Sequence, residues 1–237
     1  MYANGDVKSS VFRNRKRGDD MIKMGWKRSA SLVLLASICM AAGAADAPDG
    51  FKPMFNGKDL TGWEGDKELW SAENGEIVGK SPGIKRNEFL ATTESYADFV
   101  MTFKFKLINN PKGDANSGMQ FRSKRVANSR EMYGYQADVG QGYWGCLYDE
   151  SRRKKVLVKP AKEVIDKAAK LEDWNEYKIS CDSAHIVIEL NGVVMVDYTE
   201  SDPPEKAERS GLFGLQIHAG GPMEVHMKDA FIKVLNK

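Results

Sequence analysis

The chain has 237 residues, of which 42% are hydrophobic, 10% aromatic and 29% charged. This composition supplies one sizeable apolar core, and with three cysteines it excludes collagen-like, coiled-coil, wholly disordered and disulfide-scaffold proteins. The formal net charge of +2 arises in the first 45 residues, since residues 46–237 carry 27 basic and 30 acidic side chains, and nothing in them indicates a nucleic-acid-binding surface.

Residues 1–45 have the layout of a secretory signal peptide. A basic stretch at 23–28 precedes an apolar run at 31–40, and small residues at 42–45 suit a cleavage site. The apolar run is short for a membrane span, and a retained N-terminal anchor is the alternative. The pattern therefore predicts export to the periplasm, the cell surface or the medium.

Two details of this leader are further expectations. Residues 1–20 resemble an over-extended start, so that Met21 or Met24 is the expected initiator. Cys39 invites a lipoprotein interpretation, but the bulky Ile38 before it makes lipidation the minority case. Cleavage would leave Cys146 and Cys181, which either pair in an oxidising compartment or remain as buried thiols.

From residue 51 onward, apolar residues recur with the period of two that is typical of β-strands. The alternation over 99–107 predicts a half-buried antiparallel strand. The strand at 186–190 ends at Asn191-Gly192, a strong hairpin signal, and returns over 193–198. Further strands are predicted at 70–78, 88–91, 118–122, 133–139, 174–181, 212–218 and 223–234, the last with a bulge near Asp229.

One segment has the composition of a helix. Residues 161–171 follow Pro160, which suits a first helical turn, and they stand between predicted strands. About ten short strands with glycine-rich turns predict an all-β sandwich of two antiparallel sheets with one short helical insertion. One domain over roughly 48–237 is the simplest division of the chain.

Three predicted strands carry unusual polar residues at alternate positions, which project to one side of a sheet. A solvated outer face is the alternative, but the equivalent face of 99–107 holds only Val, Thr and Lys. Amides, a guanidinium, a carboxylate and an imidazole suit directional hydrogen bonds to hydroxyl and carbonyl groups. The set comprises Asn116, Gln120, Arg122, Gln136, Asp138, Gln216 and His218.

Aromatic residues follow the strand that contains Asp138. Tyr143 and Trp144 lie in a glycine-spaced loop, and Tyr148 comes soon after. Flat rings can cover the apolar face of a sugar, and loop residues often carry function, so we expect Trp144 to contact a ligand, with core packing as the alternative. Phosphate-loop, dinucleotide, HExxH and GxSxG signatures are absent from the sequence.

Several stretches together resemble the 3-keto-disaccharide hydrolase family. They are FNGKDLTGW at 55–63, NSGMQFR at 116–122, YQADV at 135–139, GCLYD at 145–149, WN at 174–175 and GLQIH at 214–218. The resemblance covers nearly all of residues 51–237. It implies a concanavalin-like, lectin-like jelly-roll sandwich, export, and action on oxidised glycosides or disaccharides.

The resemblance also implies a chemistry that these residues could perform. A ketone at C3 of a sugar acidifies the C2 hydrogen, so that a base can remove it and the oxygen at C1 can leave by β-elimination, with or without later addition of water. We expect His218 to be the base. Arg122 would stabilise the enolate, and Asp138 would orient His218, bind hydroxyls or exchange roles with it.

The remaining site residues are expected to bind substrate. Tyr148 or Asp149 would serve the leaving group, and Glu131 is a reserve acid. Asn116, Gln120, Gln136 and Gln216 would hold the sugar, with Trp144 against its ring. No cofactor is expected, although Asp138 and His218 could share a divalent metal with a third ligand. The main rival function is a non-catalytic, lectin-like carbohydrate-binding module.

Overall fold

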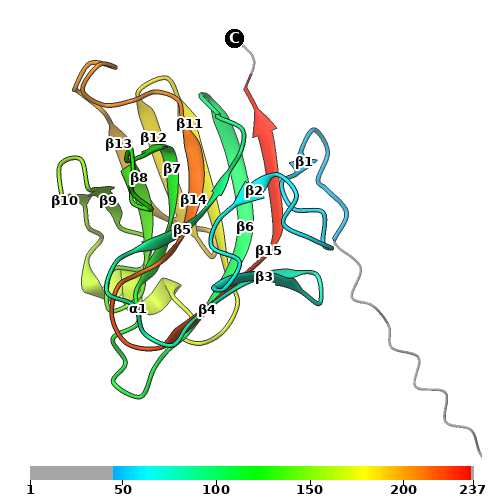
Figure 1. Cartoon of the computed structure of the whole chain (residues 1–237). Helices are drawn as coiled ribbons and strands as arrows, with labels where there is room; N and C mark the ends of the chain where they lie inside the picture. Colours follow the sequence, from blue (N-terminus) through cyan, green and yellow to red (C-terminus); the bar gives the residue numbers. More distant parts are fainter. Residues whose placement is uncertain (1–44, 236–237) are drawn as a thin grey trace, which may run out of the picture. The chain divides into compact units, whose positions relative to one another are not determined.

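The computed structural model describes residues 45–235, which fall within one compact unit. Two antiparallel sheets pack face to face as a sandwich (Figure 1). The predicted leader, with Met21, Met24 and Cys39, lies outside the described residues apart from its last position, Ala45. Within residues 45–235, no helix has the length and hydropathy of a membrane span.

In the described residues the first sheet has eight strands and the second has seven. The first sheet runs β13 (Val193–Thr199), β12 (His185–Leu190), β11 (Asn175–Asp182), β6 (Phe99–Ile108), β15 (Met223–Val234), β4 (Glu76–Ser81) and β3 (Trp70–Glu73), with β1 (Lys52–Pro53) also paired to β15. The second runs β10 (Lys155–Val158), β9 (Leu147–Glu150), β8 (Met132–Val139), β7 (Ser117–Arg125), β14 (Leu212–Ile217), β5 (Glu88–Thr92) and β2 (Trp63–Glu64).

The alternating sequence patterns form the strands that they predict. β6 alternates buried and half-buried residues along its whole length, with Phe99 and Met101 in the core between the sheets. Asn191 and Gly192 both adopt positive φ, as the tight turn between β12 and β13 requires. The bulge in β15 falls at Asp229, between the paired residues Lys228 and Phe231.

Local turn chemistry changes the predicted elements in a few places. The strand expected over 70–78 is a hairpin of β3 and β4, because Asn74 and Gly75 both take positive φ. The short strands β1, β2, β9 and β10 were not predicted, since two to four residues show little periodicity. The helix α1 (Lys162–Ala168) is shorter than the predicted 161–171.

The second sheet is buried on both faces, unlike β6. In β7 and β8 the side chains of both parities are almost all buried. One set, including Phe121 and Tyr135, packs into the core between the sheets. The other set contains Gln120, Gln136 and Asp138, none more than 5% exposed. A polar face this deeply buried differs from an ordinary solvated face. Its side chains need hydrogen-bond partners, because an unpaired buried polar group costs free energy.

Candidate functional site

A hollow of about 230 Å³ opens over the carboxyl end of β8. We call it the polar hollow. It draws side chains from β10, β9 and β8, from the loop after β8, and from the residues directly before β7 and directly after β14. Its lining consists of Asn116, Gln136, Asp138, Tyr143, Tyr148, Glu150, Val156 and His218. The structure thus brings Asp138 and His218 together with three of the predicted sugar-binding residues, although they come from distant parts of the chain.

A chain of hydrogen bonds runs along the floor of the polar hollow. Nε2 of Gln136 donates to Oδ1 of Asp138 at 2.7 Å and lies 3.3 Å from Oε1 of Gln216. Nε2 of Gln216 in turn donates to Oε2 of Glu150 at 3.2 Å. Oε1 of Gln136 is buried without a hydrogen-bond partner in the described residues. A buried carbonyl without a donor carries a free-energy cost.

Asp138 is poised to exchange a proton near neutral pH. Burial, which disfavours the charged form, raises the pKa of its carboxyl to about 7, and the nearby Glu150 acts in the same direction. The hydrogen bond from Gln136 opposes this shift but does not cancel it. A carboxyl with such a pKa can act as an acid or as a base at physiological pH.

His218 is held in the tautomer that a base requires. Its Nδ1 lies 2.6 Å from the carbonyl oxygen of Ala219. A carbonyl only accepts hydrogen bonds, so Nδ1 must carry the proton, and in the neutral ring Nε2 keeps its lone pair. The backbone N–H of Ala219 is fixed in turn by Oδ1 of Asn87 at 2.9 Å. The ring therefore lines the polar hollow with a defined orientation.

Arg122 does not reach the polar hollow, which corrects the expected role. A bulge in the pairing of β7 with β8 falls between Phe121 and Lys124, and Arg122 itself takes φ of +48°. The extra residue reverses the facing of the strand, so the guanidinium points toward the first sheet. It donates at 2.8–2.9 Å to the carbonyls of Ala97 and Ser183 and to Oδ1 of Asp98.

Asp149 also points away from the hollow, and its neighbour Glu150 takes its place. Asp149 pairs across the ladder with the core residue Tyr135, and its buried carboxylate forms ion pairs with Arg152 and Arg153. Tyr148 lies opposite Gln136 on the outward side, so Glu150, two residues on, shares that side. The alternation from Tyr148 could have identified Glu150, which the sequence analysis missed.

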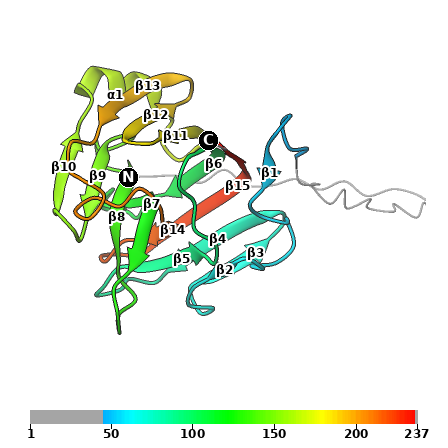
Figure 2. The same cartoon turned by 90° about the horizontal axis from the view of Figure 1, so that it is seen from above.

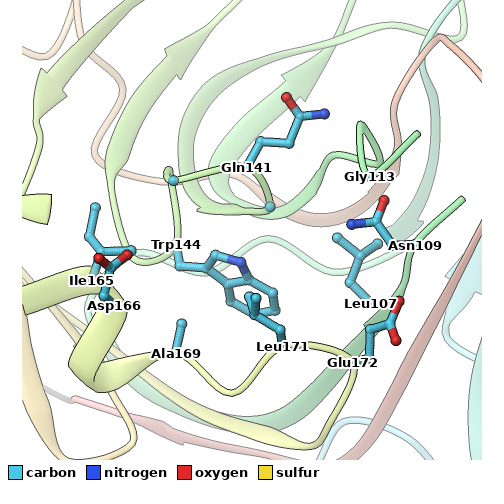
Figure 3. A pocket seen from close by; sticks show the side chains of 12 residues that line it. Leu107, Asn109, Gly113, Gln141, Trp144, Ile165, Asp166, Ala169, Leu171 and Glu172 are labelled. Atoms are coloured by element: carbon cyan, nitrogen blue, oxygen red, sulfur yellow. The ribbon is translucent and has the colours of Figure 1, made fainter. Parts of the chain in front are cut away.

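Trp144 is buried, and it faces a second hollow rather than the polar one. This apolar hollow, of about 380 Å³, lies between the loop after β8 and α1 (Figure 3). Its lining includes Leu107, Asn109, Gly113, Gly140, Gln141, Gly142, Trp144, Ile165, Asp166, Ala169, Leu171 and Glu172. The exposed ring of Tyr143, one residue earlier, lines the polar hollow instead. The predicted contact between Trp144 and the sugar ring is therefore reassigned to Tyr143.

The other predicted binding residues lie close to the polar hollow without lining it. Gln120 is fully buried, and its Oε1 has no partner within residues 45–235. Glu131 lines an adjoining hollow that also includes Ala219, and Nδ2 of Asn87 donates to it at 3.3 Å. Burial raises the pKa of Glu131. The charge of His218 acts on this carboxyl in the opposite direction.

Cysteine and metal chemistry have few candidate groups in the described part of the chain. Cys146 and Cys181 are both buried and free, which resolves the two alternatives in favour of thiols. Burial raises the pKa of each to about 12.

Residues 45–235 hold no group of three or more His, Cys, Asp or Glu side chains arranged to bind a metal ion.

A protein-family model for the 3-keto-alpha-glucoside-1,2-lyase-like domain matches residues 50–233 of the chain. The chain belongs to this family. No curated protein sequence matches it. The match confirms the resemblance carried by the motifs.

Solved structures show that this 3-keto-alpha-glucoside-1,2-lyase-like protein shares its fold with carbohydrate-active proteins. A glycosyl hydrolase candidate from Parabacteroides distasonis is 19% identical, with a TM-score of 0.57, covering 79% of this chain and 94% of that one. The carbohydrate-binding module CBM66 from Bacillus subtilis is 17% identical, with a TM-score of 0.55 and coverages of 73% and 95%.

A third similar structure defines the type of sandwich. It is a Bacillus subtilis protein with a galectin-like fold, 13% identical, with a TM-score of 0.55, covering 79% of this chain and 96% of that one. At sequence identities this low, the similarity shows a shared fold and does not show a shared function. The predicted class, a lectin-like jelly-roll sandwich of two antiparallel sheets, is confirmed.

Proposed function

We propose that this carbohydrate-active protein is an enzyme that cleaves 3-keto-glycosides by β-elimination. The observation that carries the proposal is the meeting of Asp138 and His218 in one polar hollow, with the pKa of Asp138 raised to about 7. Elimination needs one group that takes a proton and another that gives one, and these two side chains are suited to those roles at neutral pH. Family membership supports the same substrate class.

The reaction is assigned as follows. Nε2 of His218 removes the hydrogen at C2, and the electron pair of that C–H bond delocalises into the C3 ketone as an enolate. The enolate then re-forms the ketone while a C1–C2 double bond forms and the bond from C1 to the leaving oxygen breaks. Protonated Asp138 gives its proton to that oxygen. Addition of water across the new double bond would yield the 3-keto-sugar.

Without Arg122, neutral donors can stabilise the negative charge on the enolate. A nearby cation is Lys159, whose Nζ lies 3.7 Å from the ring centroid of Tyr143 and whose charge acts on Asp138. The amide of Asn116 and the phenol of Tyr148 line the polar hollow and can each donate a hydrogen bond to the ketone oxygen. The unpartnered Oε1 of Gln136 is suited to a sugar hydroxyl. These contacts would orient C2 toward His218.

A non-catalytic carbohydrate-binding module is the second candidate, and one observation favours it. The lining of the polar hollow contains no lysine or arginine among the described residues, so the cationic charge stabiliser expected from the sequence is missing. A binder needs the buried amides and Tyr143 but no proton transfer.

Incubation with a 3-keto-disaccharide distinguishes the two candidates. An eliminating enzyme releases a reducing sugar together with an unsaturated 3-keto-sugar, whose conjugated carbonyl absorbs in the ultraviolet. A binding module leaves the disaccharide intact while calorimetry still detects its association. In deuterated water, turnover through the enolate also leaves solvent deuterium at C2 of recovered substrate or hydrated product. Formation of the saturated 3-keto-sugar without deuterium at C2 would argue for direct displacement.

Two further expectations belong to this proposal. We propose export of the protein, supported by the basic, apolar and small-residue layout of residues 1–45. The N-terminal sequence of protein recovered from the cell envelope and the medium tests this, along with Met21 or Met24 as the start. We also propose catalysis without a resident metal, so that turnover should survive dialysis against a chelator.

A further inference from the structure

We propose that the apolar hollow beside Trp144 receives the leaving group of the glycoside, and that this leaving group is an alcohol bearing an apolar ring. The inference rests on the proposed function, because it takes the sugar to occupy the polar hollow. It names the chemical class of the part of the substrate that the polar hollow does not hold.

Two short segments of chain line both hollows, which places the hollows side by side. On the segment before β7, Gly113 lines the apolar hollow and Asn116 the polar one. On the segment after β8, Gly140 and Trp144 line the apolar hollow, while Tyr143 lines the polar one. Three residues of chain span at most roughly 11 Å, so the linings of the two hollows come within about that distance of each other.

The buried part of the apolar hollow suits a ring, while Asn109, Gln141, Asp166 and Glu172 supply the polar part of its lining. Leu107, Trp144 and Ile165 form its buried part and belong to the hydrophobic core. At its rim, Leu171 is 75% exposed, which makes it the most exposed of the large hydrophobic residues in the described part of the chain. A ligand ring lying against Leu171 would remove that apolar surface from water.

Trp144 forms a wall of this hollow. It is only 2% exposed and belongs to the hydrophobic core, and Figure 3 shows its indole in the midst of the lining residues. An indole is a broad apolar surface against which a second ring can pack.

The loop between the hollows is fixed in shape, so that both hollows exist before a ligand binds. Gly140 and Gly145 take positive φ, at +113° and +72°. A Cβ at Gly140 would lie 2.6 Å from the carbonyl oxygen of Ala115. The N–H of Gly145 donates to the carbonyl of Asp138 at 3.0 Å. Pre-formed sites lose less free energy to ordering when a ligand enters.

Matched glycosides test the assignment. Benzyl and methyl 3-keto-glucosides share the sugar and both release alkyl alcohols, so they differ mainly in the ring. We expect the benzyl compound to show a KM about tenfold lower or better, on the scale of apolar specificity pockets. The unoxidised benzyl and methyl glucosides, measured by calorimetry, should show the same order of affinity without any reaction.

Leu171→Asp should remove most of this advantage, because it places a charge at the exposed apolar rim without disturbing the core. The control is Val234→Asp, another substitution at an exposed hydrophobic residue, on β15 of the first sheet. The control should keep the benzyl preference.

The outcomes separate this inference from the proposed function. A benzyl preference that Leu171→Asp abolishes supports the inference, even if neither glycoside is turned over, in which case the proposed function alone fails. Equal affinities for benzyl and methyl compounds, with turnover of both, overturn the inference and leave the function intact. Tighter binding of a 3-keto-disaccharide than of the benzyl compound also overturns it, because a second sugar would then be the natural occupant.

Discussion

Arg122 of the second sheet donates a hydrogen bond from Nη2 to Oδ1 of Asp98, directly before β6 of the first sheet, at 2.9 Å. The arginine side chain is fully buried, and its other nitrogens bond the carbonyls of Ala97 and Ser183. The guanidinium thus ties the two sheets together, and each of its three nitrogens donates to a partner within the fold.

Arg122→Met should therefore destabilise the protein without removing its chemistry. The loss leaves two backbone carbonyls and the partly buried Asp98 short of donors, which costs about 3 kcal/mol. Urea unfolding measures the loss, and turnover is measured below the onset of unfolding, where kcat should stay within about threefold of the wild type. If the variant kept its stability and lost turnover, Arg122 would have a catalytic role rather than a structural one.

His218→Ala should lower kcat/KM on a 3-keto-glycoside by about 10²-fold or more, on the usual scale for a general base. Substrate affinity, measured on an unoxidised glycoside, should change little, because amides hold the sugar. His185→Ala is the matched control, since this exposed histidine pairs with Asp197 on the first sheet. Equal activity of both variants would exclude His218 from proton transfer.

The pH dependence of stability should carry the signature of Asp138. Burial raises its pKa from 3.8 to about 7, so between about pH 4 and pH 7 the native state binds more protons at this site than the unfolded state. Stability then falls as pH rises through that window, by at most about 1.4 kcal/mol per pH unit. The difference between wild type and Asp138→Asn isolates the effect, and a difference that is constant with pH would contradict it.

Activity should respond to the same ionisation. If protonated Asp138 gives its proton to the leaving oxygen, kcat should decline as pH rises above about 7. Asp138→Asn should lower kcat most for leaving groups of high basicity and least for those that depart without a proton. A pH profile that is flat from 6 to 8 in the wild type would argue against this role.

Gly145 should tolerate substitution less well than Gly142, although both take positive φ. A Cβ at Gly145 would lie 2.7 Å from Cγ of Met195, whereas one at Gly142 meets nothing within 4 Å. Gly142→Ala should cost about 1 kcal/mol, and Gly145→Ala about 2–4 kcal/mol. Thermal unfolding measures both losses of stability. Equal losses would show that backbone strain, and not the contact with Met195, causes the loss in each variant.

The buried thiols should be unreactive in the native protein. Burial raises the pKa of Cys146 and Cys181 to about 12, so little thiolate forms at pH 8. A thiol reagent should label both only after denaturation, without prior reduction. Failure to label the denatured, unreduced chain would demonstrate a disulfide instead.

Much of the fold follows from local patterns. The alternation over 99–107 places Phe99 and Met101 in the core because successive strand residues point to opposite faces. Asn191-Gly192 forms its turn because both residues accept positive φ. The same alternation predicts that Asp138 and His218 project on the polar side of their strands, and the polar hollow contains both.

The sequence by itself thus determined the sandwich, its hairpins and the two reactive side chains, since these depend on the period of two and on turn residues. Only the tertiary structure decided the fate of Arg122 and Trp144. A bulge at Arg122, at a non-glycine residue with positive φ, reverses the facing of the strand without altering its apolar pattern. Trp144 lines a hollow together with Leu107 and residues of α1, which lie far from it in the sequence. Long-range packing of this kind leaves no local periodicity to detect.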